Sequence, residues 1–158
     1  MLRKICLLAV ILISGIASAH SEQTIRIDDA WVRPTAGSKS TSAAYMNIVN
    51  LSGEADVMYK VTSAMVGKTE LHKVVTDDQG VHQMVMIDKI VIPAEQTVKL
   101  APKGLHIMLF KIKHPLNDGD KIELTIHFEN AGAITLQVPV IAKEAHKTHN
   151  HDHNHDHK

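Results

Sequence analysis

The chain has 158 residues, equal numbers of acidic and basic side chains and a single cysteine. A length of this order suits one domain with a buried core. The acidic and basic residues are interspersed and cancel to a formal charge of zero, so nothing in the sequence indicates a nucleic-acid-binding surface. Cys6 lies in the apolar segment near the start, so the rest of the chain has no disulfide, thiolate ligand or thiol nucleophile.

The first nineteen residues have the three parts of a secretory signal peptide. A basic pair, Arg3-Lys4, precedes an apolar run from Ile5 to Ile16, and Ala17-Ser18-Ala19 forms a small-residue cleavage site. The apolar run is short for a membrane-spanning helix, and no lipobox cysteine follows it. We therefore expect cleavage after residue 19, export to the periplasm of a Gram-negative bacterium, and no stable membrane insertion afterwards.

Residues 20–142 are expected to form one all-β domain. Segments such as 121–128 alternate apolar and polar side chains, as strands with one buried face do. Short turns rich in glycine, proline, asparagine and aspartate separate the segments. Many short strands at close spacing predict a β-sandwich or a Greek-key barrel. The expected strands span residues 24–28, 43–49, 57–64, 69–75, 88–92, 97–100, 105–112, 121–128 and 133–141.

Histidine and methionine side chains recur in strand-like segments of this domain. In the stretch from Gly104 to Phe110, His106 and Met108 are two residues apart, so in a strand they share one face. The apolar residues that alternate with them are expected to face the core. Imidazole and thioether together suit Cu(I), whereas thioether is a poor ligand for Zn²⁺, Mg²⁺ or Ca²⁺. The other candidates of this kind are His72, Met84 and Met86.

The spacing of four of these residues follows a known pattern. Eleven residues separate His72 from Met84, twenty-one separate Met84 from His106, and one separates His106 from Met108. This resembles the H(M)-x10-M-x21-H-x-M motif of the PCu(A)C-type periplasmic copper(I) chaperone family. Further similar segments are Ala30–Thr35, Glu70-Leu71-His72 and Pro115–Asp120. Lys73 stands where many members of that family have methionine, an optional position of the motif.

The resemblance implies a fold, a ligand set and a partner. The fold would be a cupredoxin-like Greek-key β-sandwich, and the Cu(I) ligands would be His72, Met84, His106 and Met108. Copper would pass to the CuA subunit of cytochrome c oxidase or to a Sco-like assembly protein. Met86 shares a strand face with Met84 if that segment is extended, so the sequence leaves the choice between these two thioethers open.

Residues 143–158, KEAHKTHNHDHNHDHK, form a polar tail that we expect to be disordered when it is free of metal. Imidazoles alternating with aspartate and asparagine suit Cu(II) or Zn(II). The candidate ligands here are His146, His149, His151, His153, His155 and His157, with His20 at the start of the mature chain as a possible addition.

Two functions therefore follow from the sequence, and catalysis is not among them. The first is a periplasmic copper chaperone, and the alternative is a zinc or copper scavenger or buffer that acts mainly through the tail. We expect no enzyme activity, because the sequence lacks G-x-S-x-G and H-E-x-x-H motifs and has no cysteine nucleophile. A blue-copper electron carrier is also disfavoured, since its site needs a cysteine thiolate.

Overall fold

The structure, a computed structural model, describes residues 23–37 and 39–143, and these residues contain strands and no helix. The all-β prediction is confirmed. The expected signal peptide, His20 and residues 144–158 of the tail lie outside the described residues. None of the described residues belongs to a helix that could cross a membrane. The strands are β1 (Ile25–Val32), β2 (Thr41–Asn50), β3 (Asp56–Thr62), β4 (Val66–Thr76), β5 (His82–Ile87), β6 (Ile90–Ile92), β7 (Thr97–Leu100), β8 (His106–Ile112), β9 (Lys121–Phe128) and β10 (Ala133–Pro139).

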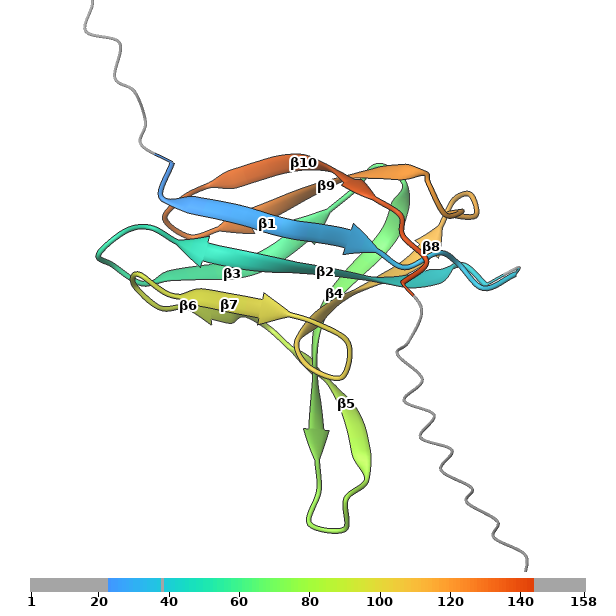
Figure 1. Cartoon of the computed structure of the whole chain (residues 1–158), viewed down its shortest axis with the longest axis horizontal. Helices are drawn as coiled ribbons and strands as arrows, with labels where there is room; N and C mark the ends of the chain where they lie inside the picture. Colours follow the sequence, from blue (N-terminus) through green and yellow to red (C-terminus); the bar gives the residue numbers. More distant parts are fainter. Residues whose placement is uncertain (1–22, 38, 144–158) are drawn as a thin grey trace, which may run out of the picture.

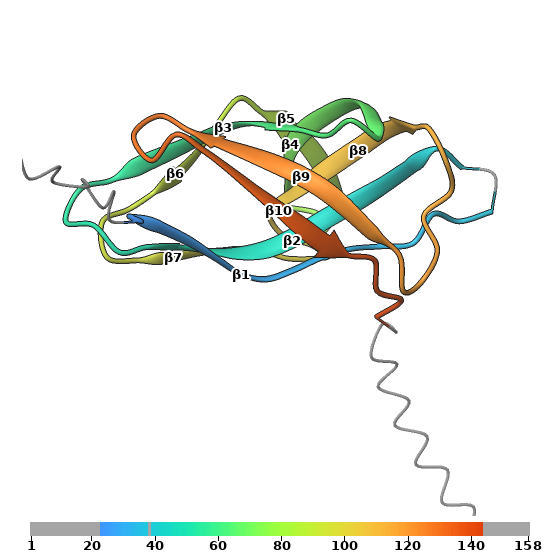
Figure 2. The same ribbon diagram turned by 90° about the horizontal axis from the view of Figure 1, so that it is seen from above.

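These strands form two antiparallel sheets. One has the order β1-β2-β8-β4-β5, with β7 also paired to β2, and the other has the order β10-β9-β3-β6. Figure 2 shows β9 and β10 crossing obliquely over β2 and β8. β4 and β5 continue past the other strands as a hairpin that projects from the body (Figure 1). This projection leaves β5 at the open edge of the first sheet.

The core lies between the two sheets and is built largely by side chains that alternate along the strands. On β9, four apolar residues at every second position are buried, from Ile122 to Phe128. On β8, Ile107 and Leu109 have no exposed surface and join the same apolar cluster. Period-two alternation therefore turns His106 and Met108 to the opposite, outer face of the first sheet.

Several observed strands differ in their bounds from the predicted segments. The first strand extends to Val32, because a bulge between Asp28 and Trp31 carries the pairing with β2 onward. Asp29 has a φ of 52° in this bulge, a left-handed backbone conformation that aspartate tolerates better than most residues. Residues 82–87 form strand β5, which the sequence had left open, and β6 begins two residues later than expected, at Ile90.

Candidate metal centre

The candidate ligands lie on the outer face of the first sheet. His72 on β4 is directly opposite His106 on β8 and directly opposite Met86 on β5. Paired residues of antiparallel strands project to the same face, with Cβ atoms about 4.5–5.5 Å apart. His106, His72 and Met86 therefore form one row across three neighbouring strands. The neighbouring pair Leu71 and Ile107 faces the core instead.

The remaining two methionines flank this row. Met108 is paired with Glu70, which lies two residues before His72 on β4. Met84 is paired with Val74, which lies two residues after His72, towards the hairpin tip. A diagonal neighbour of this kind is about 7–8 Å away, farther than a residue directly opposite. Met84 and Met86 are 56% and 58% exposed, whereas Met108 is partly buried. All five candidate ligands of the body thus share one face, with Met84 farthest from His106.

His106 has a defined tautomer. Its side chain is buried, and Nδ1 lies 2.9 Å from the backbone carbonyl oxygen of Gly104. Because a carbonyl oxygen only accepts, Nδ1 carries the proton, and Nε2 keeps a free lone pair. The sequence Gly104-Leu105-His106 therefore positions the ring and selects its metal-binding nitrogen.

His72 presents the other nitrogen. Its Nε2 donates to Glu70 Oε2 at 2.8 Å, so the proton is on Nε2 and the lone pair is on Nδ1. Among the buried side-chain nitrogen and oxygen atoms of the described residues, Nδ1 of His72 alone lacks a hydrogen-bond partner. A buried polar atom without a partner is costly, and a bound ion would satisfy it. The rings of His72 and His106 are 5.7 Å apart between centroids and inclined by 51°.

Glu70 is held from two sides. Lys68 Nζ lies 2.6 Å from Oε1, while His72 occupies Oε2. Hydrogen bonds from Lys68 and then from His72 hold the pKa of the Glu70 carboxyl below its usual value, so this group is a carboxylate at neutral pH. Sequence reasoning assigned Glu70 no role, although its position two residues before His72 places both side chains on one strand face.

An aromatic cluster borders the histidine pair on the side of β2. The rings of Trp31 and Tyr45 are 4.5 Å apart, and Tyr45 lies 6.4 Å from His106. Met108 packs against this cluster, which also includes Ala43. Burial raises the pKa of the Tyr45 hydroxyl, against the opposing charge of Arg33. Thus one flank of the candidate site is a preformed apolar wall, and the other, β5, is open.

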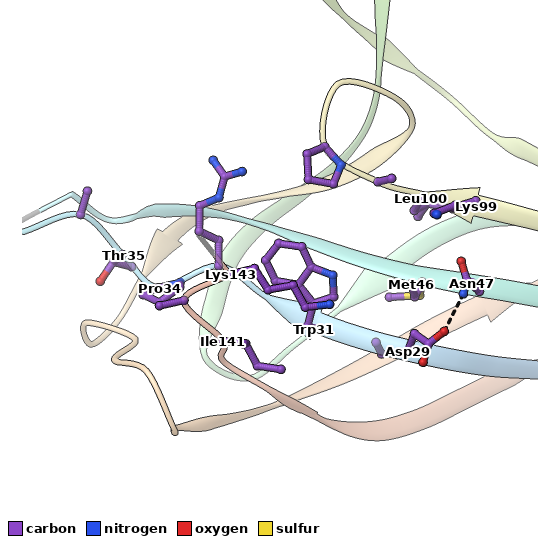
Figure 3. Close-up of a pocket in the computed structure, with 16 residues that line it drawn as sticks. Asp29, Trp31, Pro34, Thr35, Met46, Asn47, Lys99, Leu100, Ile141 and Lys143 are labelled. Atoms are coloured by element: carbon purple, nitrogen blue, oxygen red, sulfur yellow. Dashed lines mark hydrogen bonds between the residues drawn. The ribbon is translucent and has the colours of Figure 1, made fainter. Parts of the chain in front are cut away.

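A hollow of about 990 Å³ lies beside Trp31, and none of the candidate ligands lines it (Figure 3). Its lining includes Asp29, whose carboxylate accepts a hydrogen bond from Asn47 at 2.9 Å. Lys143 also lines it, with Nζ 4.6 Å from the centre of the Trp31 ring. The last described residue, Lys143, therefore lies beside Trp31 of the first sheet.

The donor set around the histidine pair is soft. Within residues 23–37 and 39–143, no group of three or more histidine, cysteine, aspartate or glutamate side chains is arranged to hold a metal ion. The remaining candidate ligands on this face are the thioethers of Met84, Met86 and Met108. Such a set fits Cu(I) and not the hard cations. The candidate tail ligands and His20 lie outside the described residues.

Comparison with known proteins places this chain in a family. A family model described as "Putative lipoprotein LpqE-like" matches residues 25–140. The chain belongs to the LpqE-like family. It is 34% identical over 116 residues to the putative lipoprotein Lxx21020 of Leifsonia xyli subsp. xyli, covering 73% of this chain and 69% of that protein. It is 32% identical over 114 residues to the uncharacterized protein RP573 of Rickettsia prowazekii, covering 70% of this chain and 62% of that protein.

Solved structures similar to this LpqE-like chain include a PCuAC domain. The copper-bound PCuAC domain from PmoF2 is 28% identical, with a TM-score of 0.65, and the match covers 76% of this chain and 94% of that domain. The solution structure of CuI-DR1885 from Deinococcus radiodurans is 25% identical, with a TM-score of 0.61, covering 79% and 83%. The cupredoxin-like fold expected from the sequence is thereby confirmed, and the resemblance to PCu(A)C domains is supported. The spacing motif and the four ligands stay predictions.

Proposed function

We propose that this protein is an extracytoplasmic copper chaperone that carries one Cu(I) ion on the outer face of the first sheet. The observation that carries the proposal is the buried, unpartnered Nδ1 of His72 beside the ring of His106. The PmoF2 domain named as copper-bound, at 28% identity, supports the same cargo. The expected signal peptide favours the periplasm as the compartment.

The proposed ligands are Nδ1 of His72, Nε2 of His106, the sulfur of Met108 and one thioether from β5. Counted spacing favours Met84 as the fourth ligand, whereas the strand register favours Met86 because it lies directly opposite His72. We infer that Met86 completes the resting site. Met84, one step closer to the hairpin tip and equally exposed, is then the alternative ligand during loading or release.

Release would proceed by ligand exchange at β5. This strand is at the sheet edge, and its thioethers are exposed, so a partner can approach them without opening the core. A thiolate of the acceptor would displace a weakly bound thioether before either imidazole leaves, because thiolate is the stronger ligand for a soft ion. The proposed acceptors are the CuA subunit of cytochrome c oxidase and a Sco-like assembly protein.

The tail supports a second function. Its six histidines, interleaved with aspartate and asparagine, favour capture of Cu(II) or Zn(II), and a protein that acted mainly through them would be a metal scavenger or buffer. Removing residues 144–158 separates the two functions. A chaperone retains one equivalent of Cu(I) after this deletion, whereas a tail-driven scavenger loses its metal binding.

The test is a Cu(I) titration against a competing chelator under anaerobic conditions. The tail-deleted protein should bind one equivalent, and its X-ray absorption spectrum should show two sulfur and two nitrogen scatterers. The double variant His106→Ala/Met108→Ala, also without the tail, should lose this equivalent. Tight Cu(I) binding that survives in the double variant would contradict the proposed site.

A further inference from the structure

We propose that Glu70 is a positioning residue that fixes the tautomer of His72, so that Nδ1 rather than Nε2 faces the metal ion. This inference rests on the proposed function. It concerns a group that would not touch copper and that the histidine–methionine spacing does not include. Its evidence is the set of contacts along one face of β4.

The alternation of β4 places Lys68, Glu70 and His72 on the outer face in succession. The carboxylate of Glu70 bridges its two neighbours, with Oε1 2.6 Å from Lys68 Nζ and Oε2 2.8 Å from His72 Nε2. Lys68 is well exposed, while Glu70 and His72 are mostly covered. The cation thus holds the carboxylate from the solvent side, and the carboxylate points its second oxygen at the imidazole.

A carboxylate in this position decides which nitrogen is free. It accepts only, so the neutral imidazole must keep its proton on Nε2 and expose the lone pair on Nδ1. Without Glu70 the Nε2–H form has no partner to favour it, and the ring is free to take either tautomer or to rotate. Carboxylate–histidine pairs of this kind typically orient metal-binding imidazoles and raise their basicity.

The two histidines of the site are hydrogen-bonded through opposite ring nitrogens. The Gly104 carbonyl binds Nδ1–H of His106 and frees Nε2, whereas Glu70 binds Nε2–H of His72 and frees Nδ1. Because Nδ1 adjoins the ring carbon nearest the backbone, an ion bound to it lies close to the sheet.

Two other roles for Glu70 fit the contacts less well. As a direct ligand it would offer a hard oxygen to a soft ion, and both of its oxygens already have partners. As a purely stabilising ion pair with Lys68 it would contribute little, because solvent screens a pair whose cation is well exposed. Orientation of His72 accounts for both oxygens and for the unpartnered Nδ1.

The test uses the full mature chain, labelled with ¹⁵N in histidine and free of metal. Long-range ¹H–¹⁵N spectra at a pH about one unit above the usual histidine pKa of about 6.5 report the tautomer of each ring. In the wild-type protein, His72 should carry its proton on Nε2 and His106 on Nδ1. In Glu70→Ala, His72 should become a mixture of tautomers while His106 stays unchanged. A wild-type His72 protonated on Nδ1, or a Glu70→Ala protein with an unchanged His72, would overturn the inference.

Two variants serve as controls. Lys68→Ala removes the cation but keeps the carboxylate, so the His72 tautomer should be retained. Glu123→Ala removes an exposed glutamate from β9 in the other sheet and should change neither ring. A tautomer change in Lys68→Ala as large as that in Glu70→Ala would contradict the assignment to the hydrogen bond.

A Cu(I) titration of the same samples against a competing chelator, followed at the His72 and His106 signals, reports occupancy of the body site separately from copper on the tail. The Glu70→Ala site should bind Cu(I) about 10–100-fold more weakly than the wild-type site, the range expected when the partner of a metal-binding histidine is lost. Equal affinity would overturn the positioning role. If the wild-type rings do not respond to Cu(I), the proposed function fails, and the metal-free spectra still decide whether Glu70 sets the tautomer.

Discussion

Replacing Met86 by leucine tests the strand register against the counted spacing. The register places Met86 directly opposite His72, with Cβ atoms about 5 Å apart, and places Met84 on the diagonal at about 7–8 Å. The difference between these two separations from His72 is comparable with the length of a metal–sulfur bond, about 2.3 Å. The nearer thioether can therefore join an ion held by the His72 ring with the smaller displacement of the strand.

The expected change in stability follows from the exposure of the two methionines, and the expected change in Cu(I) affinity follows from the loss of a ligand. Met84 and Met86 are both more than half exposed, so leucine at either position should change the free energy of unfolding by no more than about 0.5 kcal/mol. Loss of a direct ligand should exceed the effect of losing a residue that only supports a ligand, which is about 10–100-fold. We expect Met86→Leu to weaken Cu(I) binding more than about 100-fold, or about 2.8 kcal/mol, and Met84→Leu less than about tenfold.

The assay is competition with a Cu(I) chelator in proteins that lack residues 144–158, with urea unfolding of each variant as the control for stability. If Met84→Leu binds Cu(I) more weakly than Met86→Leu, the reasoning from the register is refuted. Met84, which the counted spacing favours, is then the fourth ligand. Wild-type affinity in the double variant Met84→Leu/Met86→Leu would exclude β5 from the site altogether.

Two further predictions concern the scaffold. Ile107→Ala removes a fully buried side chain between the sheets and should lower the free energy of unfolding by about 2–5 kcal/mol, measured by urea unfolding, while the metal face is left chemically unchanged. Asp56→Ala should also destabilise, because this buried carboxylate accepts hydrogen bonds from the backbone amides of Asn130 and Ala131, and each unsatisfied amide costs about 1–3 kcal/mol. Unchanged urea midpoints in either variant would contradict these assignments.

Much of the fold was readable from local alternation. The strand at residues 121–128 was predicted with its observed bounds, because one of its faces is buried along its whole length. The bounds of β5 were not predicted in the same way, because its side chains are mostly exposed on both faces. Its sequence therefore shows no alternation of buried and exposed positions. Its strand character comes from pairing with β4, which is a long-range property. The bulge at Asp29 likewise depends on the partner strand β2.

The candidate site was readable in part for the same reason. His106 and Met108 were placed on one face by their spacing alone, and the structure places both on the outer face. The juxtaposition of His72 with His106, and of His72 with Met86, depends on register across three strands, which no single segment encodes. The role inferred for Glu70 needed only the period-two rule applied to residues 70 and 72, so the signal was present in the sequence.

The hairpin between β4 and β5 has a consequence for how the pairing of these two strands can change. The backbone of Asp77 bonds that of Val81 across the turn, and Thr76 pairs with His82, so the turn sets the phase of β5. A shift of one residue in this register would place Val85 or Ile87 opposite His72 and send both methionines to the opposite face. Register shifts of the hairpin that keep the thioethers beside the imidazoles must therefore be of two residues.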